Sequence, residues 1–105
     1  MVEIAPSMLG ANFGEMKRDA ELVAPHSAYL HMDVMDGHFV PNLTMGPDLV
    51  KSLKGIGKLD VHLMVTNPSD FISDFSDAGA DIISVHVEAN NPQKAIELIK
   101  KQNIK

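Results

Sequence analysis

The chain has 105 residues, of which 45% are hydrophobic and 22% charged, and its formal net charge is -5. This length predicts one small domain, and the composition is that of a globular protein rather than a disordered or membrane-spanning one. The acidic balance excludes a generic attraction to nucleic acid or to an anionic membrane surface. Because there is no cysteine, any metal must be held by His and carboxylate side chains. With neither a signal-peptide pattern nor a long apolar run, we expect a cytoplasmic location and no contact with a membrane.

Taken in order, the chain predicts four units, each a strand followed by a helix. Asn12 with Glu15 three residues later indicates the start of the first helix, and Asn-Pro pairs at 67–68 and 91–92 open the last two. The strands are expected at residues 3–9, 28–36, 59–65 and 81–88, and the helices at 13–23, 48–54, 69–78 and 93–102. Strands that alternate with helices are typical of an α/β fold with a parallel sheet.

The most informative stretch is HMDVMDGHFVPN at 31–42, which begins as a strand and ends as a loop. Because strand side chains alternate, His31, Asp33 and Met35 share one face of it. An imidazole beside a carboxylate on a buried face is costly unless its polarity is compensated, and a divalent metal commonly does this. The stretch therefore predicts a metal that needs a further ligand from another strand.

The next predicted strand, DVHLMV at 60–65, repeats the pattern with Asp60, His62 and Met64 on one face. Its histidine is the further ligand. We therefore predict that His31, Asp33 and His62 bind one divalent metal, which for this ligand set is Zn²⁺, Fe²⁺, Mn²⁺ or Co²⁺. Met35 and Met64 are expected to form an apolar lining above the metal that excludes water.

Polar side chains interrupt all four predicted strands near their carboxyl ends, where catalytic groups of parallel α/β folds gather. A single buried histidine is usually a hydrogen-bonded core residue, but polar residues on successive strands favour a functional site. For His86 and Glu88 the pattern leaves open a supporting hydrogen bond or a direct substrate contact. His26 is expected in an exposed connection, and His38 either at the site mouth or in solvent. The seven interrupting residues are Ser7, His31, Asp33, His62, Ser84, His86 and Glu88.

Together with APSML at 5–9, GAD at 79–81 and HVEA at 86–89, these motifs resemble the ribulose-phosphate 3-epimerase family over nearly the whole chain. The resemblance implies a (β/α) barrel of TIM type, with residues 1–105 as the N-terminal half that carries its first four β/α units. It implies a metal-dependent isomerase of the pentose phosphate pathway. The reaction would interconvert D-ribulose 5-phosphate and D-xylulose 5-phosphate by proton transfer through an enediolate, with a phosphorylated ketopentose as the substrate.

Carried over by position, the resemblance makes His31, Asp33 and His62 metal ligands and Asp33 also one of two acid/base groups. Ser7, His62, Met35 and Met64 correspond to substrate-contacting positions. The family usually has Asp where Asn12 stands, and a Gly-Ala-Asp run where this chain has residues 26–28. Family members are about twice as long, and a full barrel takes some 250 residues. The later half would carry a fourth metal ligand, an Asp that is also the opposing acid/base, and the Gly-rich phosphate loops.

Two other functions are compatible with parts of the pattern. A half-barrel could bind a metal or a partner without turnover, and nothing in the residues separates this from the isomerase. A related phosphosugar barrel enzyme without metal, such as a decarboxylase, is disfavoured by the His-x-Asp pair and the later His62. In either case the outer strands would be open edges beside an exposed inner face, so we expect a homo-oligomer.

Overall fold

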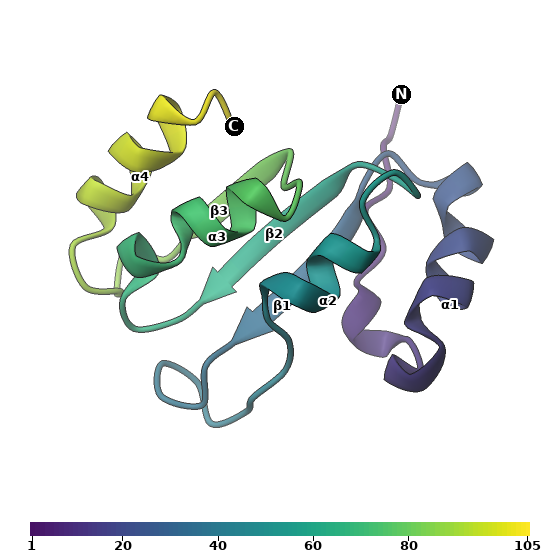
Figure 1. Ribbon diagram of the computed structural model, residues 1–105, viewed down its shortest axis with the longest axis horizontal. Helices are drawn as coiled ribbons and strands as arrows, with labels where there is room; N and C mark the ends of the chain where they lie inside the picture. The colour runs from purple at the N-terminus through teal and green to yellow at the C-terminus, as the bar shows by residue number, and fades with distance from the viewer.

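The computed structural model describes residues 1–105, and its centre is a parallel sheet of three strands in the order β1-β2-β3 (Figure 1). The strands are β1 (Leu30–Met35), β2 (Leu59–Met64) and β3 (Ile82–Val85). The α-helices are α1 (Met16–Val23), α2 (Pro47–Ser52), α3 (Ile72–Asp77) and α4 (Pro92–Lys101). Short 3-10 turns, at Met8–Gly10, Phe13–Glu15, Ala24–His26 and Pro68–Asp70, join or precede these elements. The predicted parallel α/β architecture is therefore confirmed.

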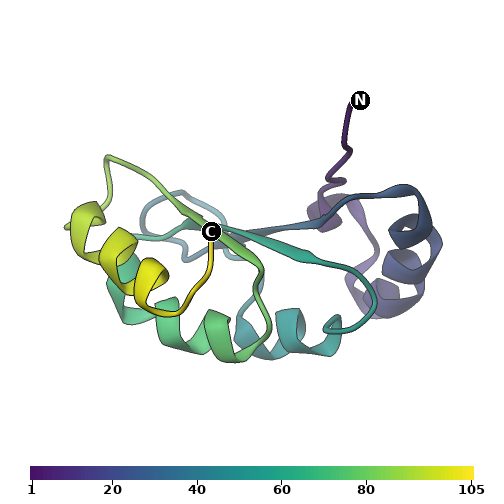
Figure 2. The same cartoon turned by 90° about the horizontal axis from the view of Figure 1, so that it is seen from above.

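The helices lie on one side of the sheet, as the view from above shows (Figure 2). Burial along the strands follows this arrangement, because in β1 and β2 every second residue is buried and those between are half-buried. Leu30, Met32 and Val34 point to the helices, whereas His31 and Asp33 lie on the opposite face. The alternation predicted for both strands is confirmed, and it leaves the polar face without a covering layer.

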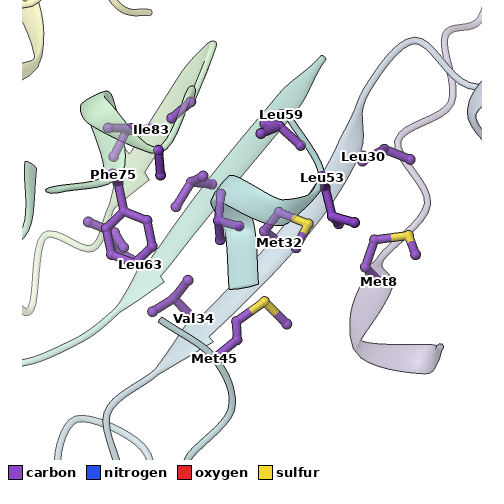
Figure 3. Packing of buried hydrophobic residues seen from close by; sticks show 14 of the residues in the cluster. Met8, Leu30, Met32, Val34, Met45, Leu53, Leu59, Leu63, Phe75 and Ile83 are labelled. Atoms are coloured by element: carbon purple, nitrogen blue, oxygen red, sulfur yellow. The ribbon is translucent and has the colours of Figure 1, made fainter. Parts of the chain in front are cut away.

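The hydrophobic core fills the space between the sheet and the helices (Figure 3). Twenty buried residues form one cluster, to which every strand and helix contributes. Phe75 of α3 is 1% exposed, and Leu63 of β2 is fully buried. Met45, from the loop before α2, joins the cluster at 8% exposure. Packing against the helices therefore stabilises the sheet on one of its two faces.

The strand predicted at residues 3–9 is absent. Ser7 makes a single isolated parallel bridge with His31, and the carbonyl oxygen of Pro6 accepts a hydrogen bond from the His31 N–H at 2.9 Å. Pro6 has no N–H to donate, which prevents a regular ladder. After it the chain turns into the 3-10 segment Met8–Gly10. The segment runs beside β1, but the sheet has three strands rather than the four expected.

The predicted strand at 81–88 is also shorter than expected, because β3 ends at Val85. Beyond it the Ala89 N–H donates to the His86 carbonyl at 3.1 Å, which turns the chain away from the sheet. On the outer edge of β3, the Ile83 N–H donates to the Lys105 carbonyl at 2.8 Å. The last residue of the chain therefore occupies part of that edge.

Helices α2 and α4 begin within one residue of their predicted starts, whereas α1 and α3 follow 3-10 turns and begin three residues later than expected. Asn91 caps α4, since its side chain accepts from the Lys94 N–H. Asn67 makes no such bond and instead accepts from Asn90 Nδ2 at 3.0 Å, which joins the loops after β2 and β3. None of the helices has the length and apolarity that crossing a membrane requires.

Candidate metal centre

Three predicted ligands meet on the open face of the sheet. The register of β1 and β2 sets Asp33 opposite His62, and His31 precedes Asp33 by two positions on the same face. His31 Nε2 lies 3.2 Å and His62 Nδ1 3.0 Å from the same oxygen, Asp33 Oδ1. One ligand atom from each residue lies within 4.8 Å of the other two. The group could therefore hold a metal ion.

Asp33 is at the centre of this group, and its carboxylate is surrounded by hydrogen-bond donors and imidazole rings. The Ser7 hydroxyl donates to Asp33 Oδ2. Partial burial raises the pKa of Asp33, but the hydrogen bonds from Ser7 and His62, with the nearby imidazoles of His31 and His62, outweigh it. The net pKa lies below the ordinary value of 3.8. The carboxylate is thus ionised at neutral pH and can act as a ligand or as a proton acceptor.

Asp60 orients the imidazole of His31. The two residues face each other across β1 and β2, and His31 Nδ1 lies 2.7 Å from Asp60 Oδ2. When Nδ1–H donates to this carboxylate, the lone pair of Nε2 faces Asp33 and is available to a cation. A metal-binding histidine usually donates its other ring N–H to such a partner. The donor set and its support therefore fit a divalent metal.

His86 extends the group across the third strand. Its Nε2 lies 2.7 Å from His62 Nε2, and the two rings are stacked with centroids 4.9 Å apart. The ring of Phe39, from the loop after β1, also contacts His86 at a centroid distance of 5.2 Å. Glu88 Oε2 is 3.6 Å from His86 Nδ1, but the Glu88 side chain is 69% exposed. Of the two roles left open for His86, the structure shows the hydrogen-bonding contact.

The strand end that carries Asp33 is fixed by Thr44. Its hydroxyl donates to the Asp33 carbonyl at 2.7 Å and accepts from the Met35 N–H at 2.9 Å. The Thr44 N–H also donates to the Met35 carbonyl at 3.2 Å. The long loop therefore returns to the strand and closes on it beside the site.

The structure brings most of the predicted residues together and adds two that sequence reasoning missed. Met35 and Met64 are half-buried on the same face as the three ligand-type residues, whereas Ser84 and Glu88 are exposed. His26 and His38 are exposed, as expected for His26. The sequence pattern sets Asp60 on the same face as His62, but its role follows from its position opposite His31 in the sheet, which the sequence does not give. Phe39 carried no pattern that could have indicated its contact with His86.

Comparison with known proteins agrees with these motifs. The sequence model of the ribulose-phosphate 3 epimerase family matches residues 3–105. The chain belongs to this family. It is 45% identical to a ribulose-phosphate 3-epimerase of Bacillus subtilis over 109 aligned positions, which cover 100% of the chain and 50% of that protein.

Two further relatives give the same result. A ribulose-phosphate 3-epimerase of Synechocystis is 48% identical over 85% of the chain and 40% of its own length. The cytoplasmic isoform of ribulose-phosphate 3-epimerase from rice, Oryza sativa, is 44% identical over 98% of the chain and 47% of its own length. The chain thus spans about half the length of the curated relatives it matches. The family is one of isomerases, as the names of its members state.

Proposed function

We propose that this chain forms the N-terminal half-barrel of a ribulose-phosphate 3-epimerase and supplies the metal-binding side of its active site. The observation that carries the proposal is the convergence of His31, Asp33 and His62 ligand atoms within 4.8 Å of one another. Membership of the family supports a phosphorylated ketopentose as the substrate class and an epimerisation beside its ketone as the reaction.

Asp33 acts as one of two acid/base groups. Its lowered pKa keeps the carboxylate ionised, so it can take the proton from the carbon beside the substrate ketone, and the substrate passes through an enediolate. Return of a proton to the opposite face requires a second group facing Asp33. None of the residues on the same sheet can occupy that position, because they all extend from one side of the substrate.

The metal would be held by His31, Asp33 and His62, and Zn²⁺, Fe²⁺, Mn²⁺ and Co²⁺ all suit these ligands. When bound, the cation supplies Lewis acidity that stabilises negative charge on the substrate oxygens. Ser7 donates its hydroxyl hydrogen to Asp33 and, in this proposal, would also contact the substrate. Met35 and Met64, half-buried on the same face, would limit the access of water.

A second candidate function is metal binding without turnover by a half-barrel that associates with another copy. Association is supported by the half-exposed polar face and by the outer edge of β3, where Lys105 forms backbone hydrogen bonds with Asp81 and Ile83. We propose that the chain forms a homo-oligomer in the cytoplasm. Sedimentation that shows a stable 11.4 kDa monomer would contradict this state.

The two functions are separated by measuring metal binding and turnover on the same preparation. Calorimetry with Zn²⁺ or Mn²⁺ should show about one ion per site, and binding should be lost in Asp33→Asn and His62→Ala but kept in the exposed Asp48→Asn. Deuterium uptake from D₂O into ribulose 5-phosphate then reports proton abstraction by Asp33, and formation of xylulose 5-phosphate reports complete epimerisation. Uptake by the Bacillus subtilis relative serves as the positive control. Metal binding without uptake favours the second function, and no metal binding rejects the site.

A further inference from the structure

Asp36 makes the densest set of hydrogen bonds to the backbone in the molecule. Its Oδ1 accepts from the N–H groups of His38 at 2.9 Å and Phe39 at 2.8 Å. Its Oδ2 accepts from the N–H of Thr66 at 2.8 Å, thirty positions further along the chain. One carboxylate therefore ties the loop after β1 to the loop after β2, at the rim of the sheet beside the candidate metal centre.

We propose that Asp36 is a positioning residue that holds Phe39 against His86 and thereby fixes the imidazole next to the metal-site residue His62. The proposal rests on the proposed function only in naming His62 as a ligand. The connection between these residues is independent of that role, because a backbone hydrogen bond joins Asp36 to Phe39 and an aromatic contact joins Phe39 to His86.

The connection has three steps. Asp36 fixes the backbone of Phe39 through its N–H, and Gly37 permits the sharp turn between them with a φ of 77°. The Phe39 ring then lies 5.2 Å from the His86 ring with their planes at 51°, a tilted arrangement typical of aromatic pairs. His86 in turn contacts His62 at 2.7 Å between their Nε2 atoms. Movement of the loop would thus change the surroundings of His86 directly.

An ionised carboxylate is required for this role. Three N–H donors need an acceptor-only group, and an asparagine amide would turn an NH₂ toward at least one of them. Burial raises the pKa of Asp36, but the bonds from Thr66, His38 and Phe39 and the charge of His38 lower it to about 2. The group is therefore charged at neutral pH.

Phe39 connects the hydrogen bonds of Asp36 to the candidate metal centre, because its ring contacts His86. Phe39 is half-buried, whereas Gly37, His38 and Pro41 around it are exposed. Its ring is the only aromatic contact of His86 outside the histidine pair. Because its ring packs against His86, it would limit the orientations of that imidazole next to His62.

The test uses nuclear magnetic resonance on the 105-residue chain, with variants Asp36→Asn, Phe39→Leu and the control Asp70→Asn. Asp70 is an exposed carboxylate on the same rim. The Phe39 ring current should shift the ring protons of His86, and Phe39→Leu should remove that shift while Thr66 amide exchange stays slow. Asp36→Asn should reduce the shift and speed Thr66 exchange about tenfold or more. Asp70→Asn should change neither quantity.

A double-mutant cycle separates positioning from general stabilisation. If Asp36 acts through Phe39, the double variant Asp36→Asn/Phe39→Leu should weaken Zn²⁺ binding no more than Phe39→Leu alone, about tenfold for a supporting contact of this kind. Additive losses, or an unchanged His86 shift in Asp36→Asn, would overturn the proposal. Phe39→Tyr, which keeps the ring, should restore both the shift and the affinity.

The role of Asp36 can be tested even if the proposed metal site is wrong or if one variant does not fold. If no variant and not even the unmodified chain binds Zn²⁺, the metal site is wrong, but the His86 shift still decides the role of Asp36. If circular dichroism shows that Asp36→Asn does not fold, measurements on the unmodified chain decide the role of Asp36. Missing nuclear Overhauser contacts between Phe39 and His86, or fast exchange of the Thr66 amide, would then reject the tether.

Discussion

His31 and Asp60 face each other across β1 and β2, and the imidazole Nδ1 lies 2.7 Å from the carboxylate Oδ2. Asp60 should therefore set which nitrogen of His31 faces the candidate metal. We expect Asp60→Asn to weaken Zn²⁺ or Mn²⁺ binding by about 10–100-fold, since the amide no longer fixes the tautomer. Calorimetric titration measures this, with the exposed Asp48→Asn as the matched control. Equal affinity in Asp60→Asn and the unmodified chain would show that His31 needs no such partner.

Asp36 predicts a dependence of stability on acid. Its pKa is lowered from 3.8 to about 2 in the folded chain. Its contribution is therefore fully present above the unfolded value and is lost as the pH falls through the folded value. The free energy of unfolding should fall less steeply between about pH 5 and about pH 2 in Asp36→Asn than in the unmodified chain. Some slope should remain, because the pKa of Asp33 is lowered in the same direction.

Urea unfolding at closely spaced pH values gives these slopes. The exposed Asp70→Asn removes the same charge from the same rim and should leave the slope unchanged. Identical slopes in Asp36→Asn and the unmodified chain would mean that its three backbone contacts do not persist in solution.

Thr44 should stabilise the end of β1 through its hydroxyl rather than through its methyl group. Thr44→Val keeps the shape but leaves the Met35 N–H and the Asp33 carbonyl without their partner. The expected loss in unfolding free energy is about 1–3 kcal/mol, the cost of an unpaired polar group in a partly buried position. Thr44→Ser retains both bonds and should lose less. Chemical denaturation compares the two, and an equal loss would assign the effect to packing.

Phe75 should dominate the stability of the helical layer. It is 1% exposed and belongs to the core cluster, so Phe75→Ala should cost about 3–5 kcal/mol. This is a large part of the about 5–15 kcal/mol that small domains possess. Leu43, at 76% exposure, provides the control, and Leu43→Ala should change stability by no more than about 0.5 kcal/mol. Thermal and urea unfolding both report the difference, and similar losses in the two variants would contradict the assigned core.

The sequence was sufficient for the features that depend on alternation along a strand. Because side chains alternate, the sequence predicts that His31, Asp33 and Met35 share one face of their strand. It predicts the same for His62 and Met64 in the next strand, and the structure confirms the alternation in both strands. The sequence could not give the register between strands, which depends on tertiary packing. That register sets His62 opposite Asp33 and turns Asp60 into the partner of His31.

The errors have local physical causes. The apolar stretch at 3–9 has the pattern of a strand, but Pro6 has no N–H for a ladder and Ser7 accepts from the Leu9 N–H as the chain turns. Asn67 has the sequence of a helix cap, yet its side chain bonds Asn90 from a loop that is distant in sequence. Such competition between local and tertiary hydrogen bonds is invisible to a pattern based on neighbouring residues.

The position of the core on the helical side of the sheet has a consequence for the folding of a longer relative during synthesis. All twenty residues of the cluster belong to the 105 residues described, and none of them requires the opposite face of the sheet to be covered. During synthesis from the N-terminus, this layer can close while later segments are still within the ribosome. The nascent half would then present a formed set of metal ligands to incoming strands, and assembly of the catalytic cavity would be the last folding step rather than the first.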